Sequence, residues 1–124
     1  MNTAITKSNK EVNIYHKKLA ESNAVTLMLR CYADLIEAGF NVKNSIGFSN
    51  DCQIIWCEYI SKPIGGICFQ ELSNTSQVWI NFSFTDKNWK QQGINKICHE
   101  YLEKYMISRN LKTISTYHVF LALS

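Results

Sequence analysis

The fold is decided by one stretch of the sequence, VWINFSFTDKNWKQQGINKICHEYLEKYM, at residues 78–106. In its first part apolar and polar residues alternate, which predicts a strand over 77–85. The alternation puts four apolar side chains on one face of that strand: Val78, Ile80, Phe82 and Phe84. In its second part the apolar residues recur every three or four positions, which predicts an amphipathic helix of about four turns from Ile94, closed by Asn110.

The junction around Gly93, between this strand and this helix, is where the sequence predicts a binding site. The first amides of a helix have no partner inside it and the helix dipole makes this end positive, so such a junction can bind an anion. Gly93 would let a phosphate come close, and Lys90 and Lys96 flank the loop. The alternative is that the glycine only ends a turn, which is the commoner role of a lone glycine before a helix. The sequence contains neither a Walker loop nor a dinucleotide fingerprint.

The segments before this unit predict one helix and two further strands. A helical period runs from about residue 19 to residue 37, and Gly39 follows it as a helix-ending glycine does. Runs rich in isoleucine and aromatic residues predict strands over 53–59 and 64–72. The pair Gly65–Gly66 in the second run marks a possible bulge.

Short links between the strands predict an antiparallel meander, and the apolar segment 112–123 is predicted to be a final strand, parallel to 77–85. Residues 1–10 are polar and are expected to be loose. Residues 11–124 are expected to form a single domain of the α/β (α+β) class. In it a mixed, mostly antiparallel sheet carries the two helices.

The composition is that of an ordinary globular domain. Of the 124 residues, 46% are apolar and 19% are charged, which suits one core and is too little for two domains. The formal net charge of +3 is too small to indicate a nucleic-acid partner. No run approaches the roughly 20 apolar residues of a membrane span, and the N-terminus lacks a signal-peptide pattern, so we expect a cytoplasmic protein. Five cysteines without CxxC spacing predict free thiols and no metal site.

The stretch at residues 78–106 resembles motif A of the GNAT acyltransferase superfamily. In that motif a splayed strand is followed by Gln/Arg-x-x-Gly-x-Gly/Ala at the start of a helix, and here the positions read Lys90-Gln91-Gln92-Gly93-Ile94-Asn95. Trp89, the strand end Thr85–Asp86, the IGGI segment at 64–67 and the order of helix, meander, helix and strand are also typical of the family. Two positions depart from the motif, because Asn95 replaces Gly or Ala and Lys90 replaces Arg or Gln.

The resemblance implies that acetyl-CoA is the co-substrate and that a primary amine is the acceptor. Backbone amides of residues 92–96 would hold the pyrophosphate, and the backbone of Phe84 and Thr85 would pair with the pantetheine arm like an added strand. The thioester would lie between the strands 77–85 and 112–123. The positions implied to bind acetyl-CoA are Phe84, Thr85, Lys90, Gln91, Gln92, Gly93, Ile94, Asn95 and Lys96.

Acetyl transfer needs a base for the amine and an acid for the leaving thiolate. Glu71, near the end of the strand 64–72, is a candidate base, and the alternative for it and for Glu58 is a solvated carboxylate at an edge. Tyr117 and His118 lie in the last predicted strand and are candidates for acid and base, the alternative being that both are structural. The chain stops at Ser124, before the helix and two strands that usually complete a GNAT domain.

Two functions therefore stay open. The chain is either an N-acetyltransferase that acts on a small molecule or a protein, or a GNAT-like binding or assembly module without turnover. A phage or mobile element is a plausible source of the second kind, because the sequence is rich in Asn, Ile and Lys. The exposed edge of the last strand and the apolar tail 119–123 predict a covering partner, most simply a second copy in a homo-oligomer.

Overall fold

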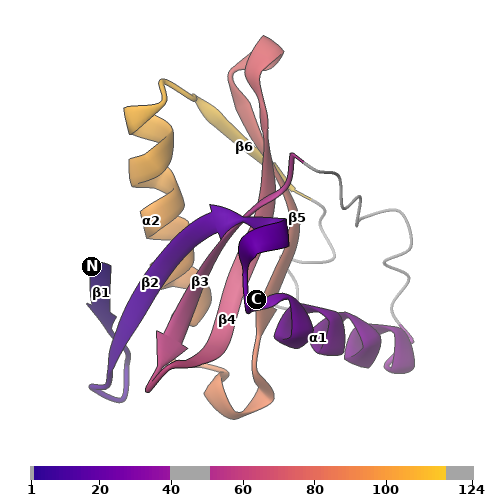
Figure 1. Ribbon diagram of the computed structural model, residues 1–124, viewed down its shortest axis with the longest axis vertical. Helices are drawn as coiled ribbons and strands as arrows, with labels where there is room; N and C mark the ends of the chain where they lie inside the picture. The colour runs from indigo at the N-terminus through magenta and orange to yellow at the C-terminus, as the bar shows by residue number, and fades with distance from the viewer. Residues whose placement is uncertain (1, 40–50, 117–124) are drawn as a thin grey trace.

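The computed structural model describes residues 2–39 and 51–116 of the chain. They form one sheet of six strands, which follow one another across the sheet in chain order (Figure 1). Neighbouring strands are antiparallel, except β5 and β6, which are parallel. The predicted α+β class with a mostly antiparallel sheet is confirmed. The strands are β1 (Asn2–Ile5), β2 (Glu11–Lys18), β3 (Gln53–Tyr59), β4 (Lys62–Leu72), β5 (Gln77–Thr85) and β6 (Thr113–Thr116).

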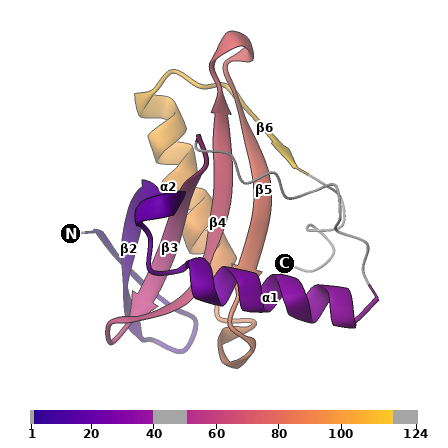
Figure 2. The same ribbon diagram turned by 45° about the vertical axis from the view of Figure 1, so that its right-hand side comes forward.

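Two helices, α1 (Val25–Glu37) and α2 (Ile94–Ser108), cover opposite faces of the sheet (Figure 2). Each helix closes a core of its own, because successive residues of a strand point to opposite faces. In β3, for example, Ile54 is buried under α1 and Ile55 under α2. Three 3₁₀ turns complete the described elements: η1 (Leu19–Glu21), η2 (Ser73–Thr75) and η3 (Lys87–Trp89).

Strand β5 contains a bulge that changes which face its side chains occupy. Phe82 pairs with Cys68 and Ile80 pairs with Phe69, so Asn81 is an extra residue in β5. An extra residue reverses the alternation of side chains along a strand. The prediction that the four apolar residues of this strand share one face is therefore wrong. Two of them lie under α2 and two under α1: Val78 and Ile80, then Phe82 and Phe84.

The glycine pair of β4 lies where two segments approach closely. A second register irregularity, between Cys57 and Glu58, lies opposite Gly65. A Cβ at Gly65 would lie 2.8 Å from the Cγ2 of Ile94 and 2.9 Å from the carbonyl oxygen of Phe84. Gly65 therefore allows the first residue of α2 to rest directly on β4, which fixes where α2 begins.

We expected residues 1–10 to be loose, but among the described residues of this segment Asn2–Ile5 forms β1 and pairs with β2. The amide of Thr6 donates to the carbonyl oxygen of Lys10 at 2.9 Å, and the hydroxyl of Thr6 accepts from the amide of Lys10 at 3.1 Å. The polar residues that suggested looseness thus satisfy one another in a tight turn. We call residues 6–10 the N-terminal turn.

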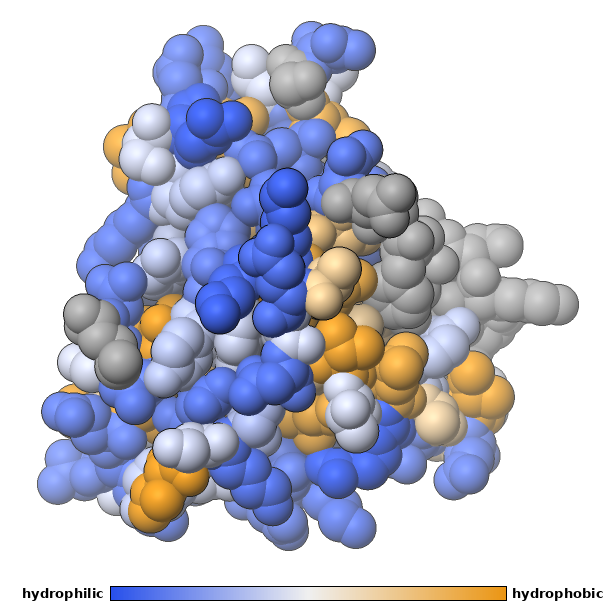
Figure 3. Space-filling model, viewed as in Figure 1, coloured by the Kyte–Doolittle hydropathy of each residue, from blue (hydrophilic) through white to orange (hydrophobic). Residues whose placement is uncertain are grey.

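The final strand is confirmed over Thr113–Thr116, which pairs in parallel with Gln77–Ile80. The remainder of the predicted strand, 117–123, lies outside the described residues, and so does the apolar tail for which we expected a partner. On the face seen in Figure 1, apolar side chains gather over α1 (Figure 3). Two large apolar residues of this helix, Leu29 and Ile36, are exposed. No helix among the described residues is long and apolar enough to cross a membrane.

Candidate functional site

The end of β5 is fixed by the buried carboxylate of Asp86. Its Oδ1 accepts a hydrogen bond from the amide of Asn88 at 2.9 Å, which caps the turn η3. Its Oδ2 accepts from the guanidinium of Arg30 at 3.0 Å, and its amide donates to the carbonyl oxygen of Ile64 at 2.8 Å. Asp86 therefore ties α1, β4 and the end of β5 together beside the start of α2.

The loop before α2 enters the left-handed backbone region twice. Gln91 has φ 64°, and Gly93, the N-cap of α2, has φ 82°. The first hydrogen bond of the helix runs from the amide of Ile97 to the carbonyl oxygen of Gly93 at 3.0 Å. The amides of residues 94–96 lie before that bond, and none of them has a partner among the residues that the structure describes. The start of α2 therefore offers three amide donors at the positive end of the helix dipole.

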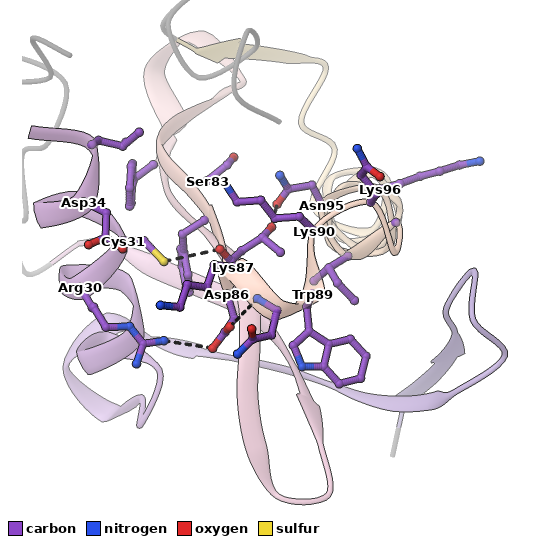
Figure 4. Close-up of a pocket in the computed structure, with 18 of the residues that line it drawn as sticks. Arg30, Cys31, Asp34, Ser83, Asp86, Lys87, Trp89, Lys90, Asn95 and Lys96 are labelled. Atoms are coloured by element: carbon purple, nitrogen blue, oxygen red, sulfur yellow. Dashed lines mark hydrogen bonds and ion pairs between the residues drawn. The ribbon is translucent and has the colours of Figure 1, made fainter. Parts of the chain in front are cut away.

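A cleft of about 1120 Å³ lies between α1, the end of β5 and the start of α2. In Figure 4, Arg30 and Asp34 project from α1 on one side, and Lys90 and Asn95 lie across from them. Small-molecule sites commonly occupy roughly 300–1,000 Å³, so this cleft has room for an extended ligand. All of the positions that the sequence predicted for acetyl-CoA line it except Gln92.

The lining of this cleft is strongly basic. Among the described lining residues the carboxylates are those of Asp34 and Asp86, and the second is paired with Arg30. The formal net charge of the whole chain is only +3, so much of its positive charge gathers here. Such a concentration of charge attracts a polyanionic ligand. The basic residues of the lining are Lys7, Arg30, Lys62, Lys87, Lys90 and Lys96.

The second half of β5 presents an edge of its backbone to the cleft. Among the described residues, β6 pairs with β5 only as far as Ile80. Further along, the carbonyl oxygen of Thr85 points toward α1 and accepts a weak hydrogen bond from the Sγ of Cys31 at 3.6 Å. Burial raises the pKa of the Cys31 thiol, which keeps it a neutral donor. An edge of this kind can pair with an extended ligand chain.

The N-terminal turn belongs to this site, which the sequence analysis missed. Gln92 is held by the turn, because its carbonyl oxygen accepts from the amide of Lys7 at 3.1 Å and its Oε1 accepts from the amide of Ser8 at 3.1 Å. The side chain of Lys7 lines the cleft beside Gly93. Residues 6–10 have the composition of a turn, but no local pattern relates them to residue 92.

Glu71 is placed beside the C-terminal end of α2, whereas the cleft lies at the N-terminal end of that helix. Its Oε2 accepts from Gln53 at 2.6 Å and from the Tyr105 hydroxyl at 3.0 Å, and its Oε1 accepts from Arg109 at 3.1 Å. Burial opposes ionisation of Glu71, but these hydrogen bonds outweigh it and lower its pKa. Its side chain is 18% exposed, so it is neither a solvated edge carboxylate nor part of the cleft lining.

Of the other catalytic candidates, the structure describes Glu58 alone. Tyr117 and His118 lie outside the described residues. Glu58 is buried in β3, where it accepts a hydrogen bond from the indole of Trp56 at 2.8 Å, and it does not line the cleft.

The sequence over residues 22–122 matches the model of the acetyltransferase (GNAT) family. This match spans most of the chain, and the strand order, the motif A loop and the helix after it lie where the resemblance implied. The chain therefore belongs to the GNAT acetyltransferase family. No curated protein matches it in sequence.

Solved structures show the same fold at low sequence identity. An aminoglycoside acetyltransferase from an uncultured soil metagenomic sample superposes with a TM-score of 0.64 at 16% identity, over 86% of this chain and 76% of that one. The ribosomal-protein-alanine N-acetyltransferase of Brucella melitensis biovar Abortus 2308 gives 0.64 at 12% identity, over 85% and 78% of the two chains. A putative GNAT family acetyltransferase of Staphylococcus aureus gives 0.62 at 16% identity, over 84% and 98%. These likenesses confirm the GNAT fold.

Proposed function

We propose that the chain binds acetyl-CoA in the cleft and transfers its acetyl group to a primary amine. The observation that carries this proposal is that three amides at the start of α2, unpaired among the described residues, lie in a basic cleft of a GNAT-family chain. The phosphates of CoA are polyanionic, and a helix N-terminus flanked by lysines is suited to them. Acetyl-CoA, when bound, supplies the activated thioester.

The amides of α2 and the backbone edge of β5 suggest how the two parts of acetyl-CoA would bind. The amides of residues 94–96 would donate to the diphosphate, and Lys90 and Lys96, which line the same cleft, would balance its charge. The backbone edge of β5 beyond Ile80 would pair with the amides of the pantetheine arm, as an added strand does. The arm would then run along β5 toward the point where β6 begins to pair, which sets the position of the thioester.

In the transfer, the amine nitrogen bonds to the acetyl carbon and the carbon–sulfur bond breaks. The amine loses a proton and the departing thiolate gains one, so one base and one acid are needed. Tyr117 and His118 remain our candidates for these two roles. Glu71 is a weaker candidate for the base, because hydrogen bonds from three side chains already engage its carboxylate.

Calorimetric titration with acetyl-CoA and with CoA tests the binding half of the proposal. Turnover is then followed by chromatographic separation of CoA from acetyl-CoA, because a partly exposed thiol of the chain, that of Cys31, would react with thiol reagents. The acceptor panel contains an aminoglycoside, a peptide with a free N-terminal alanine and a simple polyamine. Binding together with turnover of one acceptor supports the enzyme. Binding without turnover leaves the alternative of a binding module, and no binding at millimolar ligand refutes the proposal.

A further inference from the structure

The N-terminal turn contacts both ends of the loop before α2. At the end of the loop next to α2, the amides of Lys7 and Ser8 both donate to Gln92 at 3.1 Å. At the end of the loop next to β5, the Nζ of Lys10 lies 5.1 Å from the ring centroid of Trp89. It also lies 5.4 Å from the ring centroid of Tyr59. The position of the loop before α2 therefore depends on residues that precede it by most of the chain.

The side chain of Lys7 runs over the glycine of this loop. A Cβ built on Gly93 would lie 3.8 Å from the Cε and 3.9 Å from the Cγ of Lys7, so the Lys7 side chain passes the open side of this glycine. Gly93 immediately precedes the three α2 amides that have no partner in the part of the chain that the structure describes. The backbone of Lys7 is held in place by its hydrogen bond to Gln92, and its aliphatic side chain lies beside Gly93. Lys7 therefore loses less conformational freedom when its ammonium group contacts an anion at the start of α2.

We propose that Lys7 binds the diphosphate of acyl-CoA directly, so that the N-terminal turn is a functional part of the co-substrate site. The inference rests on the proposed function and adds a ligand-binding residue to it. Lys90 lies in the loop and Lys96 in α2, whereas Lys7 lies in the turn between β1 and β2. Cations on separate elements surround a doubly charged group better than neighbouring ones do.

The test compares affinities for CoA and for 3′-dephospho-CoA, which share the diphosphate and differ in the 3′-phosphate. Lys7→Met keeps most of the stem and removes the charge, and Lys7→Arg keeps the charge. Lys17→Met is the matched control, because Lys17 is an exposed lysine of β2 outside the cleft lining.

We expect Lys7→Met to bind both ligands about tenfold more weakly at low ionic strength, since a charge-assisted hydrogen bond is lost. The affinities of Lys7→Arg should stay within roughly threefold of those of the unsubstituted chain. The affinities of Lys17→Met should equal those of the unsubstituted chain. The affinity of the unsubstituted chain should also fall more steeply with salt than that of Lys7→Met.

Equal affinities of the unsubstituted chain and Lys7→Met would overturn the inference. A loss confined to CoA would assign Lys7 to the 3′-phosphate and overturn it as well. An unsubstituted chain that binds neither ligand would refute the proposed function itself, so the two failures are distinguishable. Urea unfolding of Lys7→Met, expected to match that of the unsubstituted chain, shows that a weaker affinity does not come from a damaged fold.

Discussion

The hydroxyl of Thr85 donates a long hydrogen bond, 3.4 Å, to the Oδ1 of Asn95, joining the last residue of β5 to the first turn of α2. The side chain of Asn95 is thus directed along the wall of the cleft toward β5 (Figure 4). Because its oxygen is engaged by Thr85, its NH₂ group remains as a donor in the lining. Where the family motif has Gly or Ala, this chain adds a donor beside the amides of α2.

Substitution of Asn95 tests this role. Asn95→Asp keeps the acceptor for Thr85 but replaces the NH₂ donor by a negative charge, so we expect CoA to bind at least about tenfold more weakly. Asn95→Ala removes only one neutral donor and should cost about threefold. Asn23→Asp, at an exposed position outside the cleft lining, is the control for the added charge. Calorimetry gives all four affinities, and tighter binding by Asn95→Ala would show that the side chain obstructs the site instead.

Gly93 and Gly39 form a matched pair for testing the glycine of the loop. Both have a left-handed backbone, with φ 82° and 90°, and both have room for a Cβ. Alanine at either position should therefore destabilise the fold by about 1 kcal/mol, measured by urea unfolding. Only Gly93→Ala should also weaken CoA binding, by about tenfold or more, because only that methyl group would lie beside the phosphates. Equal CoA affinities for the two variants would mean that Gly93 serves the turn alone.

Gly65→Ala is expected to destabilise the fold, although Gly65 itself is not among the residues that we assign to CoA binding. Its Cβ would lie 2.9 Å from a backbone oxygen of β5 and 2.8 Å from the first side chain of α2. Overpacking of this kind costs about 1–3 kcal/mol. The urea midpoint of unfolding measures it. An unchanged midpoint would show that α2 shifts away freely, and the helix start would then be less firmly fixed than we infer.

Glu71→Gln distinguishes a structural from a catalytic carboxylate. The pKa of Glu71 is lowered in the fold, so its ionised form contributes stability that is fully present above its unfolded pKa and is lost as the pH falls through its folded pKa. We expect Glu71→Gln to lose about 1–2 kcal/mol at pH 7, because Gln53, Tyr105 and Arg109 lose a charged acceptor. This difference should shrink below about pH 4.

The control for this change is Glu21→Gln, at an exposed position of η1, which should leave stability nearly unchanged at both pH values. Turnover of the Glu71 variant at pH 7 completes the comparison. Lost turnover with unchanged stability would support the catalytic role predicted from the sequence.

Local patterns explain the parts of the fold that the sequence predicted well. Strands β3 and β5 have the predicted bounds, since each is a short apolar or alternating run ended by polar residues. Helix α2 begins directly after Gly93 because a glycine with a left-handed backbone separates the strand period from the helix period. The anion-binding site expected at that junction was predicted from the same glycine and helix start.

The rest depends on contacts between distant segments. No residue near Asn81 marks the bulge, which is a property of the pairing between β4 and β5. The contribution of Lys7 depends on a turn that pairs with residue 92, so it cannot be found by reading either segment alone. Glu71 looked available as a base because its partners Gln53 and Arg109 are far from it in the chain.

The central claim is that the amides at the start of α2 hold the diphosphate of CoA. Backbone amide NMR of the ¹⁵N-labelled chain, titrated with CoA, tests it most directly. We predict saturable shifts that are largest at residues 93–96 and at Lys7, with the amides of Lys17 and Glu21 unchanged. Binding that leaves residues 93–96 unshifted, or no shifts anywhere at millimolar CoA, would contradict the account.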